Sequence, residues 1–181
     1  MRLVLTDRDG VLNEDRPEGV SHPDALRLIP GAAEAVRRLN AAGVPVACVT
    51  NQSAVGRGLI SARELEAIQA KLTSDLAAMG ARLDLVLVAT DAPERPGPRR
   101  KPAPGMLLEA FHRFHVEPEQ AVMIGDDLRD LEAAAAAGCG RILVRTGKGA
   151  ALAAAGVPER LQPVQLFDSF AAAVDRLLGM R

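Results

Sequence analysis

Short apolar runs alternate with amphipathic segments along the whole chain, and this alternation constrains the fold more than any other feature of the sequence. The runs have the length and β-branched content of buried strands. They predict strands at Leu3–Thr6, Val44–Thr50, Leu83–Ala89, Ala121–Ile124, Ile142–Arg145 and Gln162–Phe167. The last contains Pro163, which suits an edge strand. Alternating strands and helices predict an α/β fold built on a doubly wound, Rossmann-like parallel sheet.

The segments between the runs carry apolar residues at helical spacing. The clearest is Ser61–Met79, which opens on Ser-Ala-Arg-Glu, a capping box formed by Ser61 and Glu64. Further helices are expected at Ala32–Ala42, Pro104–His115, Leu128–Ala137 and Asp168–Leu178. No linker divides the 181 residues, so we expect a single domain over residues 1–181.

Composition narrows the classes of partner. The chain carries 22 basic and 23 acidic residues, so it lacks the large excess of positive charge that is typical of proteins that bind nucleic acids or membranes. It has no Trp or Tyr for an aromatic stacking platform, and its two cysteines form no disulfide framework. No apolar run has the length of a membrane span. We expect a soluble cytoplasmic protein that acts on a small phosphorylated metabolite, and a monomer is the favoured oligomeric state.

Four polar clusters each follow the end of an expected strand. They are Asp7-Arg-Asp-Gly10, Thr50-Asn-Gln-Ser53, Arg99-Arg-Lys-Pro102 and Gly125-Asp-Asp-Leu-Arg-Asp130. The carboxyl ends of parallel strands meet at one edge of a sheet, so the four clusters should lie together there. Any one cluster alone could be a turn, a charged loop or a helix start. Their joint occurrence, in order, favours a functional site.

The residue types in these clusters suit phosphoryl transfer. Close carboxylates repel one another unless a hard cation lies between them, and Mg²⁺ prefers oxygen ligands. Asp7 could attack phosphorus, and Asp9, two residues along and on the same side, could protonate the leaving oxygen and later deprotonate water. Thr50, Asn51 and Lys101 offer hydroxyl, amide and ammonium groups to a phosphoryl group.

On these motifs the chain resembles the haloacid dehalogenase superfamily of phosphatases. It is most similar to the D-glycero-D-manno-heptose 1,7-bisphosphate phosphatases, and next to the histidinol-phosphate phosphatases. The residues that carry the resemblance span most of the chain: Asp7-Arg-Asp-Gly-Val-Leu-Asn13, Val49-Thr-Asn-Gln-Ser53 with Arg57-Gly58, Arg100-Lys-Pro-Ala-Pro-Gly-Met106, Val144-Arg-Thr-Gly-Lys148 and the acidic cluster that begins at Gly125.

The resemblance implies a capless fold and a Mg²⁺-dependent phosphomonoesterase that works through an aspartyl-phosphate, on a heptose bisphosphate. Asp7 would be the nucleophile and Asp9 the acid/base. The Asp7 carboxylate, the Asp9 backbone carbonyl and Asp126 would hold Mg²⁺. Thr50 and Lys101 would stabilise the phosphoryl group. Phosphate or sugar contacts would come from Asn51, Gln52, Ser53, Arg100, Asp127 and the Asp15–Glu18 loop.

Three positions depart from the pattern that the resemblance implies. Asp91–Pro98 contains no Cys or His, so we expect no structural zinc in that loop. Val11 stands where Thr is usual. Asp127 stands where the heptose enzymes tend to carry Lys, and we expect its negative charge to weaken binding of a second phosphate.

Other functions stay open on the sequence. Within the enzymes, the alternative substrate is histidinol phosphate or another small phosphate ester. A phospho-accepting receiver domain also uses carboxylates, a hydroxyl and a lysine on a parallel sheet, but its acidic pair lies elsewhere in the chain. A nucleotide-binding module is disfavoured because the chain has neither a dinucleotide fingerprint nor a phosphate-binding loop motif.

Overall fold

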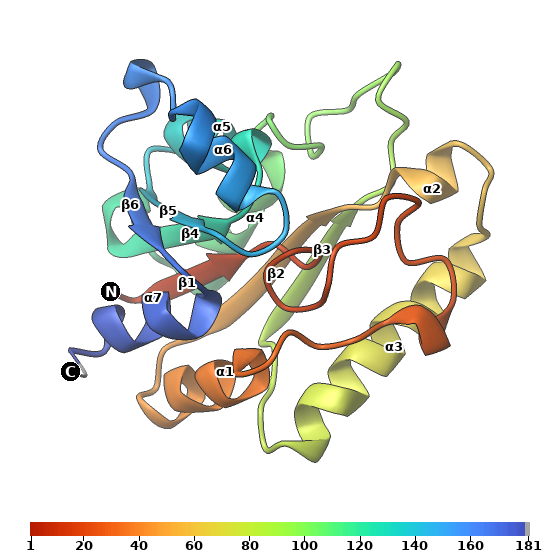
Figure 1. Ribbon diagram of the computed structural model, residues 1–181, viewed down its shortest axis with the longest axis horizontal. Coiled ribbons are helices and arrows are strands. Elements are labelled where there is room, and N and C mark those ends of the chain that lie inside the picture. The colour runs from red at the N-terminus through yellow and green to blue at the C-terminus, as the bar shows by residue number, and fades with distance from the viewer. Residues whose placement is uncertain (180–181) are drawn as a thin grey trace.

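The computed structural model describes residues 1–179, which fold around a six-stranded sheet in the order β3-β2-β1-β4-β5-β6 (Figure 1). Every strand pair is parallel. The strands are β1 (Leu3–Thr6), β2 (Val46–Asn51), β3 (Leu85–Ala89), β4 (Ala121–Gly125), β5 (Gly140–Val144) and β6 (Gln165–Phe167). The chain builds outward from β1 to β3, then crosses to β4 and continues outward. This doubly wound order confirms the predicted fold class and puts a switch point between β1 and β4.

Helices cover both faces of the sheet. They are α1 (Ala32–Ala41), α2 (Ser53–Gly56), α3 (Ala62–Ala78), α4 (Gly105–Phe114), α5 (Leu128–Ala137), α6 (Gly149–Ala155) and α7 (Phe170–Leu177), with short 3-10 turns at Pro23–Ala25, Pro118–Gln120 and Glu159–Leu161. In Figure 1, α1, α3 and α7 lie below the strands, while α5 and α6 lie above them. Apolar residues of α4 pack in the same cluster as those of α5. The sheet is therefore the middle of three layers.

The two faces of the sheet build separate parts of the core. Val4 of β1 packs in the cluster that includes apolar residues of α1, α3 and α7. Its neighbours Leu3 and Leu5 pack in the cluster that includes α4 and α5. This alternation is the two-residue period of a strand that is buried on both faces. It fixes β1 at the centre of the molecule, so its carboxyl end is held rigidly.

The sequence predicted most elements to within a few residues. The strand Leu3–Thr6 and the helix Leu128–Ala137 have the predicted bounds, and Ser61 and Glu64 form the predicted capping box. The predicted strand Ile142–Arg145 instead occupies Gly140–Val144. The helix α6 was not predicted, because its Gly-Ala-Ala-Leu-Ala-Ala-Ala sequence has no clear apolar stripe. The short helix α2 was also missed.

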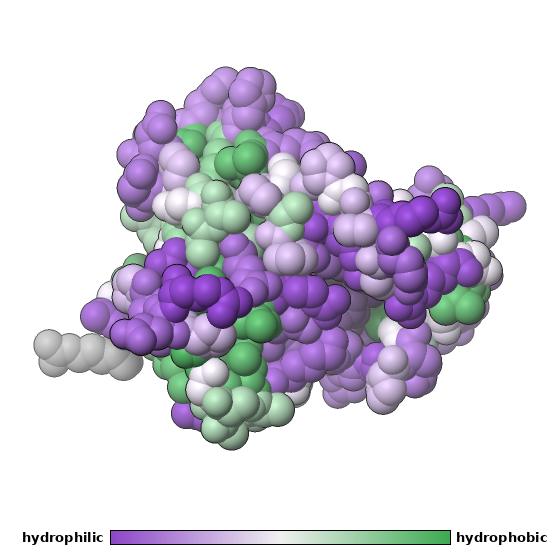
Figure 2. Space-filling model, turned by 90° about the horizontal axis from the view of Figure 1, so that it is seen from above, coloured by the Kyte–Doolittle hydropathy of each residue, from purple (hydrophilic) through white to green (hydrophobic). Residues whose placement is uncertain are grey.

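The face of the molecule that Figure 2 shows is mostly hydrophilic, with some hydrophobic patches. The exposed large apolar side chains lie far apart in the sequence: Met1, Leu59, Met79, Leu108 and Leu166. Isolated residues of this kind are common on folded proteins. Among residues 1–179, no helix is both long enough and apolar enough to cross a membrane.

Candidate active site

The four polar clusters meet in one pocket at the carboxyl ends of the central strands. The pocket is lined by every predicted site residue: Asp7, Asp9, Thr50, Asn51, Gln52, Ser53, Arg100, Lys101, Asp126 and Asp127. The predicted substrate loop at residues 15–18 lines it as well. The pocket lies beside the switch point of the sheet, where open α/β sheets bind their ligands.

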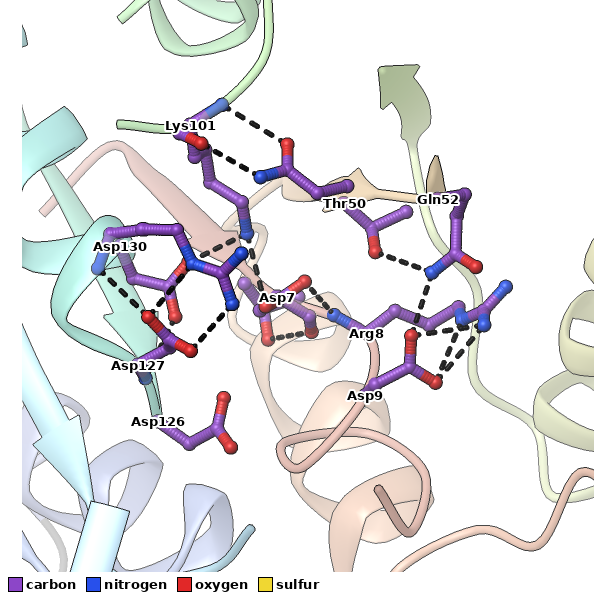
Figure 3. Close-up of polar contacts among 12 residues, drawn as sticks. Asp7, Arg8, Asp9, Thr50, Gln52, Lys101, Asp126, Asp127 and Asp130 are labelled. Atoms are coloured by element: carbon purple, nitrogen blue, oxygen red, sulfur yellow. Dashed lines mark hydrogen bonds and ion pairs between the residues drawn. The ribbon is translucent and has the colours of Figure 1, made fainter. Parts of the chain in front are cut away.

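At the bottom of the pocket, the Lys101 ammonium joins two carboxylates (Figure 3). Its Nζ atom lies 2.6 Å from Asp130 Oδ1 and 3.0 Å from Asp7 Oδ2. The Lys101 side chain is only 2% exposed, so these ion pairs are largely withdrawn from water. Burial alone would lower the pKa of Lys101, but Asp130 and Asp7 outweigh it and raise the pKa. Lys101 is therefore a fixed positive charge next to Asp7.

Asp7 comes directly after β1, and its carboxylate is oriented by its own backbone. Oδ1 accepts a hydrogen bond of 2.7 Å from the Arg8 backbone N–H, while Oδ2 lies by Lys101. Burial raises the pKa of Asp7 to about 6, and Asp130 and Asp9 add to this while Lys101 opposes it. The side chain keeps 15% of its surface exposed, toward the pocket. Asp7 is thus a held carboxylate with an open approach.

Asp9 is surrounded by hydrogen-bond donors. The buried Arg8 guanidinium lies 3.0 Å from both carboxylate oxygens, Asn13 Nδ2 lies 2.8 Å from Oδ1, and Gln52 Nε2 lies 2.7 Å from Oδ2. Burial alone would raise the pKa of Asp9, but Arg8 and these hydrogen bonds hold it below its ordinary value. The charged form of Asp9 is therefore favoured.

Gln52 and Asn51 were both expected to contact phosphate or sugar, yet the structure gives their amides protein partners. Gln52 Nε2 donates to Asp9 and, at 3.0 Å, to the hydroxyl oxygen of Thr50. Asn51 pairs with the backbone of Lys101. Because Thr50 accepts from Gln52, its own proton is left to donate toward a ligand.

Three carboxylates could hold a metal ion together. One oxygen each from Asp7, Asp126 and Asp130 lie within 4.8 Å of one another. Burial, then Asp7 and Asp130, raise the pKa of Asp126 to about 8. An all-oxygen donor set in which negative charges repel fits Mg²⁺. Asp130 was not among the predicted ligands, and here it also binds Lys101. The Asp9 side chain lies outside this trio; the prediction assigned it only a backbone carbonyl.

The Asp126 carboxylate fits into a cradle made by two glycines. Gly10 and Gly147 both have positive φ angles, and a Cβ atom on either would overlap the Asp126 carboxylate. The Lys148 backbone N–H donates a 2.8 Å hydrogen bond to Asp126 Oδ2, and the Thr146 hydroxyl binds Gly10 O at 2.6 Å. The segment from Thr146 to Lys148 therefore orients a candidate metal ligand.

Five positive side chains besides Lys101 line the pocket: Arg16, Arg57, Arg100, Arg129 and Lys148. Three of them are well exposed, with side-chain exposures of 48% for Arg57, 42% for Arg129 and 56% for Lys148. Arg100 is buried, and its guanidinium donates a 2.9 Å hydrogen bond to Asp91 O. We call Arg57, Arg129 and Lys148 the cationic rim. It could attract an anionic part of a ligand.

Asp127 forms ion pairs with two positive side chains. Its side chain caps α5, and its two oxygens lie 3.0 and 2.7 Å from the Arg129 guanidinium. Lys148 Nζ lies 3.7 Å from Asp127 and 3.4 Å from Asp15. Burial alone would raise the pKa of Asp127, but the Arg129 contacts lower it to about 2. The negative charge of Asp127 is therefore paired with two cations, and the weakened binding of a second phosphate stays a prediction.

Sequence reasoning missed several residues that shape the site. Arg8 and Asn13 lie within the first motif, and the resemblance included them without giving either a role. The Thr146–Lys148 segment also carried the resemblance but was given no role, although its position after the fifth strand was an available sign. Asp130 was part of the acidic motif but had no assigned role. What was missing in each case was the long-range partner, which only the fold supplies.

Two family models match the chain. One, described as haloacid dehalogenase-like hydrolase, matches residues 4–79, and one described as HAD-hydrolase-like matches residues 98–173. Together these segments contain all the predicted site residues.

Curated relatives align along nearly the whole chain. A D-glycero-beta-D-manno-heptose-1,7-bisphosphate 7-phosphatase of Bordetella bronchiseptica is 39% identical over 179 residues, which is 98% of each chain. The protein of the same description from Pseudomonas aeruginosa is 37% identical over 176 residues, or 97% of each chain.

Solved structures give the same match in three dimensions. The D,D-heptose 1,7-bisphosphate phosphatase from B. bronchiseptica, complexed with magnesium and phosphate, has a TM-score of 0.93 and 38% identity, over 99% of both chains. The corresponding protein from Burkholderia thailandensis has a TM-score of 0.76 and 37% identity, over 98% of this chain and 99% of that one.

Proposed function

The chain belongs to the haloacid dehalogenase family of hydrolases, in its phosphatase subgroup, and we propose that it removes a phosphate from a sugar bisphosphate, namely a heptose 1,7-bisphosphate. The observation that carries the proposal is the floor of the pocket. There the Asp7 carboxylate faces open space, with the Lys101 ammonium 3.0 Å away and Asp126 and Asp130 beside it. A nucleophile, a cation and an oxygen-ligand set for Mg²⁺ are the parts that phosphoryl transfer needs.

In the first half of the proposed reaction, an Asp7 oxygen attacks phosphorus. The bond from phosphorus to the ester oxygen breaks, and Asp9, when protonated, gives its proton to that oxygen as the sugar leaves. The phosphoryl group is then an acyl phosphate on Asp7. Lys101 and the Thr50 hydroxyl stabilise the charge on its oxygens.

In the second half, water attacks the phosphorus of the aspartyl-phosphate. Asp9 takes a proton from this water, and the bond between phosphorus and the Asp7 oxygen breaks, which releases inorganic phosphate and restores Asp7. The donors from Arg8, Asn13 and Gln52 favour the charged form of Asp9, which is the form this step requires.

Asp7 and Asp126, with the Asp9 backbone carbonyl, would hold Mg²⁺, and Asp130 would support the set through Lys101 and its place beside both carboxylates. When bound there, Mg²⁺ supplies positive charge that offsets repulsion between the nucleophile and the phosphoryl oxygens. The Bordetella relative contains magnesium and phosphate, which supports this choice of ion.

The positive charge around the pocket favours a substrate that carries a second phosphate over one whose leaving group is a neutral alcohol. The cationic rim presents three exposed positive side chains at the mouth of the pocket that holds Asp7. A second phosphate would find charge-assisted partners there. The relatives described as heptose bisphosphate phosphatases, aligned over nearly the whole chain, favour a heptose as the sugar.

A phosphate-release screen tests the proposal. The substrates are both anomers of D-glycero-D-manno-heptose 1,7-bisphosphate, a hexose bisphosphate, a sugar monophosphate, histidinol phosphate and a nucleotide, each with and without Mg²⁺. We expect the highest kcat/KM on a heptose bisphosphate, with activity lost when divalent cations are removed. A clear preference for histidinol phosphate would replace the proposed substrate, and release from none of these esters would refute phosphatase activity.

A further inference from the structure

We infer that Asn51 is a positioning residue, which acts through Lys101 and does not itself bind the substrate. This inference rests on the proposed function, since it needs Lys101 to stabilise a phosphoryl group. It assigns a different role from the phosphate or sugar contact that the sequence suggested.

The first observation is how the Asn51 amide is used. Asn51 Nδ2 donates a hydrogen bond of 2.8 Å to Lys101 O, and the Lys101 backbone N–H donates one of 3.0 Å to Asn51 Oδ1. Both polar atoms of the Asn51 side chain are thus engaged with the same residue. A two-point contact fixes both position and orientation of the Lys101 backbone, whereas a single bond would leave it free to rotate.

The second observation is the difference between the two segments that Asn51 joins. Asn51 is the last residue of β2 and pairs with Ala89 of β3, so the sheet fixes its place. Lys101 lies in a turn between β3 and α4, outside any helix or strand. The Asn51 contact therefore attaches a turn to the rigid sheet, 50 residues away in the sequence.

The third observation is how tightly the Lys101 ammonium is confined. Nζ must lie near Asp7 and Asp130 at once, at 3.0 and 2.6 Å, in a buried position. A lysine side chain has several rotatable bonds, so its reach depends on where its backbone sits. A shift of the turn by a fraction of an ångström would pull the ammonium away from the phosphoryl position. Misplacement by about 1 Å can reduce a rate by about a hundredfold.

Neighbouring Arg100 does not depend on Asn51 in the same way. Its backbone N–H bonds Gly97 O at 3.1 Å, and its guanidinium bonds Asp91 O at 2.9 Å. Loss of the Asn51 contact should therefore affect Lys101 first.

A double-mutant cycle on Asn51→Ala and Lys101→Ala tests the inference. The measurements are kcat and KM on a sugar phosphate, and the inhibition constant of inorganic phosphate. Asn51→Ala alone should lower kcat about tenfold to a hundredfold and weaken phosphate inhibition. In the Lys101→Ala background the same change should alter both by less than about twofold, because no ammonium remains to be misplaced. If the effects of the two substitutions on kcat multiply independently, Asn51 acts on the substrate without Lys101, and the inference is overturned.

Two further variants keep the test decisive. Asn51→Asp retains an acceptor for the Lys101 N–H but opposes Lys101 O, so it should be impaired and coupled in the same way; it replaces Asn51→Ala in the cycle if that variant does not fold. Asn40→Ala is the matched control, because Asn40 Oδ1 also accepts from a backbone N–H distant in the sequence, that of Arg82 at 2.9 Å, and neither residue lines the pocket. It should leave kcat and phosphate inhibition unchanged.

Failure of the proposed function can be told apart from failure of this inference. An inactive wild type would refute both. An active wild type in which the effects of the Asn51 and Lys101 substitutions are independent would refute the inference alone.

Discussion

The floor and the rim of the pocket are built in opposite ways. On the floor, Lys101 and Asp130 have side chains that are 2% and 1% exposed and are held by ion pairs to each other and to Asp7. On the rim, Arg57 and Lys148 have side chains that are 48% and 56% exposed, and their ion-pair partners lie 3.4 to 3.9 Å away. The floor is fixed by the core, while Arg57 and Lys148 on the rim are held by long, solvated contacts. Arg129 is the exception on the rim, because its guanidinium lies 2.7 Å from Asp127.

This difference suggests a division of work. Preorganised charge in a dry site can stabilise a transition state without reorganisation, which suits the phosphoryl transfer that every substrate shares. Exposed cations contribute mainly attraction and selection, and salt screens them. Floor substitutions should therefore reduce turnover of all esters, and rim substitutions should change which ester is preferred.

The largest expected effect comes from the nucleophile. Asp7→Asn keeps the shape of the side chain but replaces the attacking carboxylate by an amide, so kcat should fall by at least about a thousandfold on every phosphate ester. Circular dichroism and thermal melting should show a folded protein. A folded Asp7→Asn variant with more than a tenth of the wild-type rate would refute Asp7 as the nucleophile.

A substitution outside Asp7, Asp126 and Asp130 should disrupt the floor of the pocket nearly as strongly. Gly147→Ala places a Cβ atom against the Asp126 carboxylate, at a φ of +57° that disfavours Ala. We expect about tenfold to a hundredfold weaker metal binding, measured directly by Mn²⁺ electron paramagnetic resonance. Gly43→Ala is the control, since Gly43 also has a positive φ but has no atom near a Cβ. Equal Mn²⁺ affinity in the two variants would contradict the cradle.

Predicting the fold from the sequence succeeded where one local pattern was sufficient. The run Leu3–Thr6 is apolar on both faces because β1 is central, and the stripe of Ser61–Met79 matches a helix that covers one face of the sheet. The helix α6 escaped prediction because packing decides it: Gly149 has no room for a side chain beside Val144 O. This contact cannot be predicted from the local sequence.

The site was predictable as a set of residues, but not as a set of contacts. Position after a strand was enough to gather Asp7, Thr50, Lys101 and Asp126 into one pocket. It could not tell that Gln52 bonds Asp9, or that Asp130 pairs with Lys101, because each pair is joined only by the fold. Residue roles that depend on a distant partner therefore needed the structure.

The raised pKa values of two carboxyl groups on the floor should make metal binding and stability depend on pH. The pKa of Asp7 is raised from 3.8 to about 6 and that of Asp126 to about 8, each by burial first. In metal-free protein, the stability gained from these protonated carboxyls is present below about pH 3.8 and is lost as the pH rises through about 6 and then 8. Mg²⁺ must displace the same protons, so its binding should strengthen over that window, by up to about tenfold per pH unit for each proton displaced.

Thermal melting with and without Mg²⁺, at pH values from about 5.5 to 8.5, measures this effect. The increase in Tm caused by Mg²⁺ should grow with pH. An increase that stays constant across the range would mean that Mg²⁺ does not compete with protons on Asp7 and Asp126.

The smallest effect is expected at Asp127, which lies beside Arg129 and Lys148 of the rim. In Asp127→Asn the cap of α5 is kept, because Asn is also a good N-cap residue. Losing the negative charge favours a second phosphate, but losing the contacts that orient Arg129 and Lys148 disfavours it. The ratio of kcat/KM for a bisphosphate to that for its monophosphate should therefore change by less than about threefold. A tenfold rise in this ratio would mean that Asp127 acts mainly by repelling the second phosphate.

The most direct test of the division between floor and rim is this same ratio, measured for Lys101→Ala and for Arg57→Ala at low salt. The account predicts that Lys101→Ala lowers kcat on the bisphosphate and the monophosphate by the same factor, so the ratio does not change. Arg57→Ala should leave kcat nearly intact and lower the ratio about threefold to tenfold, through a higher KM for the bisphosphate. A ratio that falls in Lys101→Ala and stays constant in Arg57→Ala would contradict the account.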